Sequence, residues 1–182
     1  MNKIYYILIA LVLVFFGYGI ITKKNNDPLK KEKRVPCQKT TTTFEKIANK
    51  KLSNKAVELL ESGNFIIKSR IEQASFMESK ILNYINVEKA DEILLSVLKK
   101  YQKEQINKND KLIIDYYILE NDKEDTGKKG TKCKLYAGYL VFEFKLENKL
   151  IYKIQTDYMK MDTSDIPERM DCVIKSFITL KG

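Results

Sequence analysis

The first apolar run is the feature that most constrains what this chain can fold into. Residues 4–22 form a stretch of nineteen residues without a charged side chain. As an α-helix rising about 1.5 Å per residue, this run would extend about 28 Å, close to the thickness of the hydrocarbon core of a bilayer. Tyr5, Tyr6 and Tyr18 lie toward its two ends, where aromatic side chains commonly settle at lipid headgroups. The run therefore predicts an N-terminal transmembrane helix that anchors the chain, over residues 1–24.

A cleaved secretory signal peptide and a buried helix of a soluble domain are the alternatives to an anchor. The run is longer than the usual signal-peptide core of about 7–15 residues, and its small residues, Gly17 and Gly19, are followed by further apolar residues. A helix that is apolar on every face is typical of a membrane span or of the centre of a large protein. We therefore favour an uncleaved signal anchor.

The basic residues on the two sides of the run give conflicting evidence on orientation. Lys3 precedes the run, whereas a basic cluster follows it: Lys23, Lys24, Lys30, Lys31, Lys33 and Arg34. The positive-inside rule would keep the following domain in the cytoplasm, where this cluster would contact anionic lipid. A short N-terminal anchor, however, resembles a secretory signal, which usually carries the following domain across the membrane. We expect a single-pass protein of the bacterial inner membrane with a periplasmic C-terminal domain, and keep the cytoplasm-facing, lipid-binding domain as an alternative.

Composition makes several kinds of chemistry improbable. The 182 residues include no histidine, which is the commonest general acid–base and metal-ligating side chain. The cysteines lack zinc-binding spacing, and the glycine-bearing stretch 126–130 lacks the spacing of a phosphate-binding loop. We therefore expect no enzymatic activity, no cofactor and no metal site.

The net charge of +9 raises the question of nucleic-acid binding. Tyr117 and Tyr139 fall on the outward side of the strands predicted below, where they could stack on bases. Glu143 and Asp157 share that side and would repel phosphate groups, so we expect no nucleic-acid partner. Asp115 and Asp157 could face each other as a catalytic pair, but scattered outward carboxylates are usually solvent contacts.

Beyond the anchor, the chain divides into a tether and a folded domain. Residues 25–43 contain Pro28, Pro36 and many polar side chains, which argue against a packed element and predict a basic polar tether. Residues 44–182 are long enough for one compact domain with a hydrophobic core.

The period of the apolar residues changes within this domain. Spacings of three and four residues predict helices between residues 44 and 106, at about 44–52, 53–61, 68–86 and 88–106. Alternation then predicts four antiparallel strands between residues 111 and 181, at about 112–118, 136–146, 150–158 and 170–180. In the central hairpin, the alternation places Phe144 opposite Tyr152 and Phe142 opposite Ile154 on one apolar face.

The expected fold class is therefore α+β, with several helices packed on one face of a four-strand antiparallel meander. In its order of elements, this architecture resembles NTF2-like and cystatin-like domains, although no motif carries the resemblance. We expect a membrane-anchored binding or assembly domain, an envelope-complex subunit or accessory protein with a protein partner. An immunity-type protein bound to one toxin is a specific version of this class. An NTF2-like pocket for a small ligand or an enzymatic reaction is the alternative.

Three cysteines, Cys37, Cys133 and Cys172, leave one thiol over whichever pair forms a disulfide. In the predicted meander, Cys133 and Cys172 lie at the same end of the sheet, but one strand separates them. Two strand spacings are about 9.5 Å, beyond the roughly 7 Å limit for a disulfide, so this pair requires neighbouring strands or a loop folded across the sheet end. Cys37 could reach either cysteine, but its capture would order the tether. We predict one disulfide in an oxidising compartment, with Cys133–Cys172 slightly favoured over the alternative partner Cys37.

Overall fold

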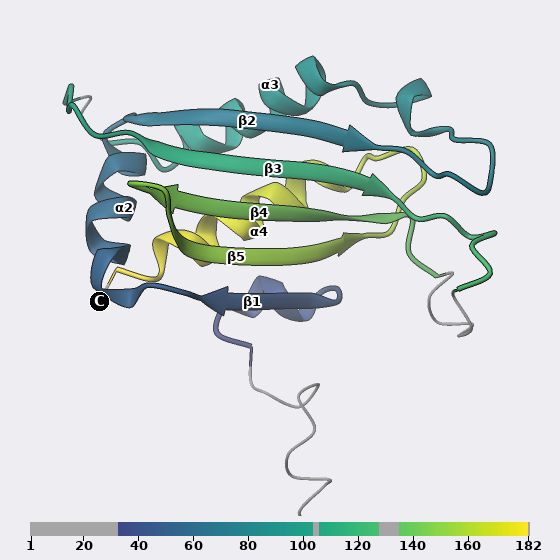
Figure 1. Ribbon diagram of the computed structural model, residues 1–182, viewed down its shortest axis with the longest axis horizontal. Helices are drawn as coiled ribbons and strands as arrows, with labels where there is room; N and C mark the ends of the chain where they lie inside the picture. Colours follow the sequence, from purple (N-terminus) through teal and green to yellow (C-terminus); the bar gives the residue numbers. More distant parts are fainter. Residues whose placement is uncertain (1–32, 104–105, 128–134, 182) are drawn as a thin grey trace, which may run out of the picture. The chain divides into compact units, whose positions relative to one another are not determined.

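The computed structural model describes residues 33–103, 106–127 and 135–181 of the chain. These residues build a five-stranded mixed sheet with three α-helices packed against it (Figure 1). The strands are β1 (Thr43–Ile47), β2 (Phe65–Glu72), β3 (Leu112–Glu120), β4 (Gly138–Leu146) and β5 (Lys149–Tyr158). The helices are α2 (Ser53–Glu61), α3 (Val87–Lys99) and α4 (Ile166–Ile178), with short 3-10 helices η2 (Pro36–Lys39), η3 (Lys50–Leu52) and η4 (Ile81–Asn83).

The order of the strands in the sheet is β1-β5-β4-β3-β2. Strands β3, β4 and β5 form an antiparallel meander, and β1 pairs antiparallel with β5. Strand β2 instead runs parallel to β3. A parallel pair needs a long crossover connection, and α3 supplies it between β2 and β3. The side chain of Asn86 caps α3 by accepting a hydrogen bond from the backbone N–H of Lys89.

The central hairpin confirms the register predicted from the sequence. Phe144 is opposite Tyr152, and Phe142 is opposite Ile154. A bulge between Phe144 and Lys145 changes the register of the residue pairs that lie between it and the turn. The α+β composition and the positions of α2, α3, β3, β4 and β5 also follow the prediction.

The predicted four-strand antiparallel meander is wrong, because two segments expected to be helical form strands at the sheet edges. Thr43–Ile47 pairs with β5, and Phe65–Glu72 pairs with β3. Loose helical spacing in 44–52 and 68–86 was outweighed by backbone pairing with a neighbouring strand. The β-branched residues Ile66, Ile67 and Ile71 suit a pleated surface better than a helix.

The predicted last strand, residues 170–180, is also wrong, since most of this segment lies in α4. Alternating apolar residues suggested a strand, but a helical stripe is present in the same residues. The side chains that it buries completely are Met170, Val173, Ile174 and Phe177. Pro167 in the first turn, with Glu168 beside it and Lys175 in the last turn, is the usual signature of a helix.

These corrections also remove the likeness to NTF2-like and cystatin-like domains. That likeness required the helices to come first and the strands to follow them. In the structure, β1 and β2 precede α3, and α4 follows β5. In the described chain, helices are thus interspersed among the strands and are not confined to the first half.

Within residues 33–103, 106–127 and 135–181, no helix combines the length and the hydropathy that a membrane crossing requires. The predicted transmembrane helix and the single-pass inner-membrane localisation with a periplasmic domain therefore have no support in the described residues. The apolar run 4–22, which was the basis of both predictions, lies outside the described residues.

Residues 34–43, the C-terminal part of the predicted tether, belong to the folded unit. Residues 36–39 form η2; Val35, which precedes it, is 2% exposed, and Gln38 within it is 1% exposed. The compact unit that contains the sheet begins at Arg34. Polar composition alone suggested a tether here, whereas hydrogen bonds and a disulfide described below hold this segment.

Aromatic side chains fill the space between the helices and the sheet. Tyr116 stacks on Phe142 with ring centroids 4.8 Å apart, and Phe144 stacks on Phe177 of α4 at 3.9 Å. All four side chains are at most 1% exposed. Burying each of them contributes roughly 1.5–3 kcal/mol to the free energy of unfolding. The layer between helices and sheet is thus a packed core.

We predict that Gly138→Ala destabilises the fold by about 2–3 kcal/mol, because overpacking at a rigid site forces backbone shifts. A Cβ atom at Gly138 would lie 2.0 Å from the carbonyl oxygen of Leu119 and 2.5 Å from the ring of Tyr158. Gly127→Ala is the matched control, since its Cβ would meet the Asp125 side chain at 3.1 Å in an exposed loop. Urea unfolding measures both variants. Equal stability of Gly138→Ala and the wild type would contradict the close packing of β3, β4 and β5.

Candidate functional site

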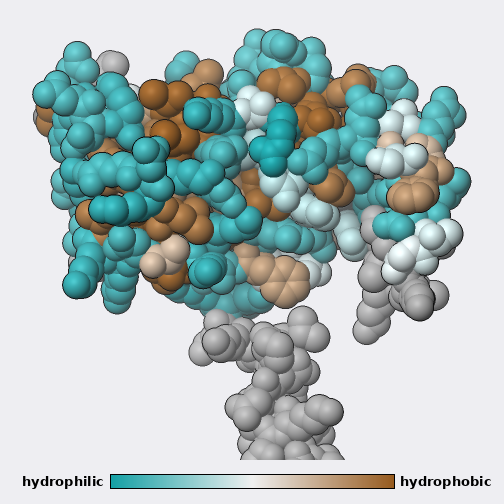
Figure 2. All heavy atoms as spheres, in the orientation of Figure 1, coloured by the Kyte–Doolittle hydropathy of each residue, from teal (hydrophilic) through white to brown (hydrophobic). Residues whose placement is uncertain are grey.

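The sheet face opposite the helices is uncovered by other elements of the described chain, and we call it the outer face. Helices α3 and α4 lie behind the sheet in Figure 1, so this face points toward the viewer. Figure 2 shows it as a mixture of hydrophilic and hydrophobic side chains. A row of charged residues crosses all five strands in register: Lys46, Lys153, Glu143, Asp115 and Lys68.

Ion pairs connect charges of alternating sign along this face. From β5 to β2 they join Lys153 to Glu143 (2.7 Å), Glu143 to Lys145 (2.7 Å), Lys145 to Asp115 (2.8 Å), Asp115 to Arg70 (3.6 Å), and Arg70 to Glu72 (3.0 Å). We call this chain of six residues the charge lattice. Hydrogen bonds from Lys145 and Lys153 lower the pKa of Glu143, and those to Asp115 and Glu143 raise the pKa of Lys145.

An aromatic cluster adjoins the charge lattice. The guanidinium of Arg70 lies 4.4 Å from the ring centroid of Tyr117, and Tyr117 meets Tyr139 edge-on at 6.4 Å. A depression of about 220 Å³ lies beside this cluster, lined in part by Val141 and Lys153. Partial burial raises the pKa of both phenols, so the tyrosines stay neutral hydrogen-bond donors at physiological pH.

The outer carboxylates do not form the catalytic pair considered from the sequence. Asp115 is opposite Glu143, whereas Asp157 is opposite Tyr139, and β4 separates the two aspartates. Asp157 is 6% exposed, and this burial raises its pKa. No group of three or more Cys, Asp or Glu side chains that could hold a metal ion occurs in the described part of the chain.

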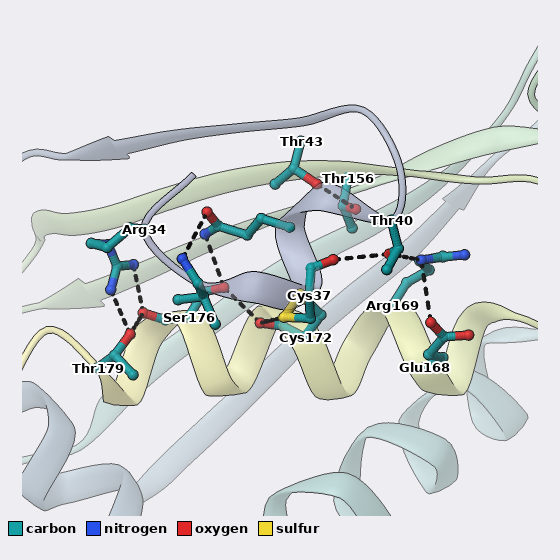
Figure 3. Close-up of a disulfide and its surroundings, with 12 residues drawn as sticks. Arg34, Cys37, Thr40, Thr43, Thr156, Glu168, Arg169, Cys172, Ser176 and Thr179 are labelled. Carbon is teal, nitrogen blue, oxygen red and sulfur yellow. Dashed lines mark hydrogen bonds and ion pairs between the residues drawn. A yellow bond between two sulfur atoms is a disulfide. The ribbon is translucent and has the colours of Figure 1, made fainter. Parts of the chain in front are cut away.

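A disulfide joins Cys37 of η2 to Cys172 of α4, with a Cα–Cα distance of 5.8 Å (Figure 3). The slight preference for Cys133 as the partner of Cys172 is therefore wrong, and the alternative partner Cys37 is confirmed. That preference assumed that Cys172 lies on a strand and Cys37 on an unstructured tether. Cys37 instead lies in the short helix η2, which packs against the thirteen-residue helix α4 that carries Cys172. Cys133 is outside the described residues.

Arg34, predicted to contact a membrane surface, is bound within the fold beside this disulfide. It donates hydrogen bonds to Glu45 at 2.8 Å and to the carbonyl oxygen of Ser176 at 2.7 Å. Burial acts to raise the pKa of Glu45, but hydrogen bonds from Arg34, Tyr152 and Gln38 outweigh this effect and lower it. Lys33 lies in the described part of the chain; the remaining predicted lipid contacts, Lys23, Lys24, Lys30 and Lys31, lie outside it.

A hollow of about 520 Å³ opens at the end of the sheet where α2 terminates. It is lined by Glu58, Glu61, Ser62, Lys103, Ile106, Lys108 and Lys181. Glu61 accepts hydrogen bonds from Lys103 at 2.7 Å and from Lys181 at 3.0 Å. We call this the basic hollow. It lies at the surface, whereas the small-ligand alternative placed a pocket between the helices and the sheet.

At the other end of the sheet, two buried carboxylates hold the loop of residues 73–80. Glu120 accepts hydrogen bonds from Ala74 N, Ser79 Oγ and Lys80 N, and Asp122 accepts them from Ser75 N and Phe76 N. Glu120 is 2% exposed and Asp122 is 8% exposed. Hydrogen bonds to a charged acceptor contribute about 1.5–3 kcal/mol each, so these carboxylates fix the shape of the loop.

Sequence reasoning identified Tyr117 and Tyr139 as outward residues but missed Arg70 and the two carboxylates that hold the loop. Arg70 was assigned to a helix. The signal that could have found it is the alternation of polar Lys68, Arg70 and Glu72 with inward residues from Phe65 onward, which is a strand pattern. Nothing local in the sequence marks Glu120 and Asp122 as buried.

No family model and no curated protein matches this chain. Among solved structures, the chain is similar to a leucine-to-methionine variant of PelC, crystallised as a dodecamer, from Paraburkholderia phytofirmans. The identity is 12%, the TM-score is 0.39, and the match covers 78% of this chain and 98% of that chain. A likeness at this level indicates no function.

We predict that Cys37→Ser lowers the free energy of unfolding by about 4–5 kcal/mol, because the disulfide closes a very long loop in the unfolded chain. The two cysteines are 135 residues apart in the sequence. Urea unfolding without and with a reductant measures this effect. The reductant should destabilise the wild type but leave the variant unchanged. Cys133→Ser is the control, and its stability should equal that of the wild type in both conditions.

We predict that Lys145→Met destabilises the fold by about 1 kcal/mol at pH 7, because it leaves two carboxylates facing each other across strands. The pKa of Glu143 is lowered in the fold, so its stabilising contribution exists above the unfolded pKa of about 4.3 and disappears as pH falls through the folded value. The difference from wild type should therefore shrink as pH falls below about 4.3 and vanish at a lower pH, at which Glu143 is protonated in the fold as well. Urea unfolding of the variant and the wild type at pH 7 and at the low pH measures this difference in the free energy of unfolding.

Lys46→Met is the matched control for this variant. Lys46 is an exposed residue of β1 on the same charged row, but it is not part of the charge lattice. Its removal should change the free energy of unfolding by less than about 0.5 kcal/mol at either pH. A loss at Lys145→Met that persists at low pH would contradict the electrostatic role of this lysine.

Proposed function

We propose that this chain is a non-enzymatic binding domain that recognises a protein through its outer face. The aromatic cluster of Arg70, Tyr117 and Tyr139 is the observation that supports this proposal most directly. Arginine and tyrosine are enriched in the residues that dominate the affinity of protein interfaces. Here both residue types lie together on a sheet face that the described chain leaves uncovered.

The charge lattice supports recognition of a protein more than catalysis. Each of its carboxylates is paired with a cation, so none is an unpaired base of the kind that acid–base catalysis uses. The alternation of sign across four strands gives a pattern that only a partner with the complementary pattern can match. A polyanion such as nucleic acid would be repelled by Glu72, Asp115 and Glu143.

Site-specific photo-crosslinking in cells of the source organism tests this proposal. A photoreactive amino acid replaces Tyr139 in the full chain, and its adducts are compared with those from position 95. Leu95 is an exposed residue of α3, 40% exposed, so it reports on non-specific collisions. We expect one discrete protein adduct from position 139 that is absent from position 95.

Two variants of the crosslinking protein test whether the aromatic cluster carries the binding. Arg70→Glu should reduce the adduct at least tenfold, because it reverses the charge over Tyr117 and beside Asp115. Lys46→Met should leave the adduct unchanged. Equal adducts from positions 139 and 95, or an adduct insensitive to Arg70→Glu, would contradict the proposal. Thermal unfolding confirms that each variant is folded.

A further inference from the structure

Strand β2 forms the longer of the two open edges of the sheet (Figure 1). It has eight residues, whereas β1 at the opposite edge has five. One side of β2 pairs with β3 along its whole length, in an unbroken register from Phe65 to Glu72. On its other side, β2 forms no backbone hydrogen bond within the described chain. The N–H and C=O groups of such an edge are a template for a further strand.

The apolar layer of the sheet is only partly covered at β2. Phe65, Ile67 and Ile71 face the helices but are partly exposed. The residues opposite them on β3 are all 0% exposed: Leu112, Ile114 and Ile118. On the outer face, Ile66 of β2 is 49% exposed. A strand added to this edge would therefore remove apolar side chains from water, as β2 does for β3.

Lys68 supplies the charge that a strand added on this side would meet at the outer face. It is exposed and forms no ion pair with any residue that the structure describes. The other two charged residues of β2 on this face, Arg70 and Glu72, are paired with each other, and Arg70 also pairs with Asp115. A carboxylate opposite Lys68 in the added strand would therefore gain a cross-strand ion pair.

The inner side of the same edge offers no such positive charge. There Asp91 of α3 accepts hydrogen bonds from Ser69 and Tyr116. The remaining exposed charges of α3 balance in sign: Glu88 and Glu92, Lys89 and Lys99. The edge thus favours a strand with a carboxylate on its outer side and apolar side chains on its inner side.

A second copy of this chain is a poor match for the edge. Two β2 strands that pair edge to edge, with both outer faces on one side, must run antiparallel about a two-fold axis. The two registers with the greatest overlap place Lys68 opposite Lys68, or opposite Arg70 at two positions. Like charges directly opposite each other destabilise a sheet. Lysine on an edge strand is one of the means by which proteins prevent such pairing.

We propose that the protein bound at the outer face adds an extended segment to β2 as a sixth strand, with a carboxylate opposite Lys68. Arg70 belongs both to β2 and to the aromatic cluster, so a partner that covers Tyr117 lies beside this edge. Backbone hydrogen bonds along the strand supply affinity, and its alternating side chains supply selectivity. This inference rests on the proposed function, because it describes how that same partner binds.

Crosslinking from two positions of β2, in the full chain and in cells of the source organism, tests the added strand. A photoreactive amino acid replaces Ile66 in one variant and Glu72 in another, and both positions face outward. Two paired strands advance at the same rate, so the residues that face these positions are about six apart in the partner. We expect both adducts on one segment of the protein trapped at position 139, at this separation and with an acidic residue between them.

A charge exchange tests the role of Lys68. Lys68→Glu should reduce the adduct from position 66 at least tenfold, because it places two carboxylates opposite each other. Replacing the acidic residue of the crosslinked segment by lysine should restore the adduct. Lys46→Glu is the matched control, since Lys46 lies in the same charged row on the other edge strand, and it should leave the adduct unchanged. Thermal unfolding checks that each variant is folded.

The outcomes separate the added strand from the proposed function. Adducts from positions 66 and 72 on separate segments, on a second copy of this chain, or on no protein would overturn the added strand. A yield that Lys68→Glu leaves unaffected would overturn it as well. If position 139 still gives its discrete adduct in these cases, the proposed function stands. If that adduct is also absent, both proposals fail.

Discussion

The structure depends on the alternation of apolar residues in β3, β4 and β5. Every second residue in these strands points toward the helices, so Phe142 and Phe144 enter the core while Glu143 between them faces outward. A shift of one residue would exchange the two faces, placing charges in the core and aromatic rings in water. The same alternation therefore creates both the packed core and the charge lattice of the outer face.

This alternation is also what made part of the structure predictable. The pairs Phe144–Tyr152 and Phe142–Ile154 follow from a hairpin whose pattern is local, and the outward positions of Tyr117 and Tyr139 follow from the same periodicity. Strand β1 was not predicted, because its short segment becomes a strand only through pairing with β5, and the alternation in β2 was overlooked in favour of the helical spacing that follows it. The spacing within β1 alone was compatible with a helix.

Contacts between distant parts of the sequence decided the remaining features. Residues 36–39 have the composition of a linker, yet a disulfide to a helix 135 residues away holds them in place. The loop of residues 73–80 is fixed by Glu120 and Asp122, which lie forty or more positions later in the sequence. Local periodicity reveals neither which distant residue such a side chain contacts nor whether it is buried. These contacts therefore could not be predicted from the sequence.

The charge lattice and the aromatic cluster would contribute differently to binding at the outer face. Since every charge of the lattice already has a partner, a protein that covers the lattice must desolvate paired charges and gains little net affinity from them. A mismatched partner would break those pairs and bury an uncompensated charge, which is far more costly. The rings of Tyr117 and Tyr139 lose little by being covered. Affinity would therefore come from the aromatic cluster, and selection among partners from the lattice.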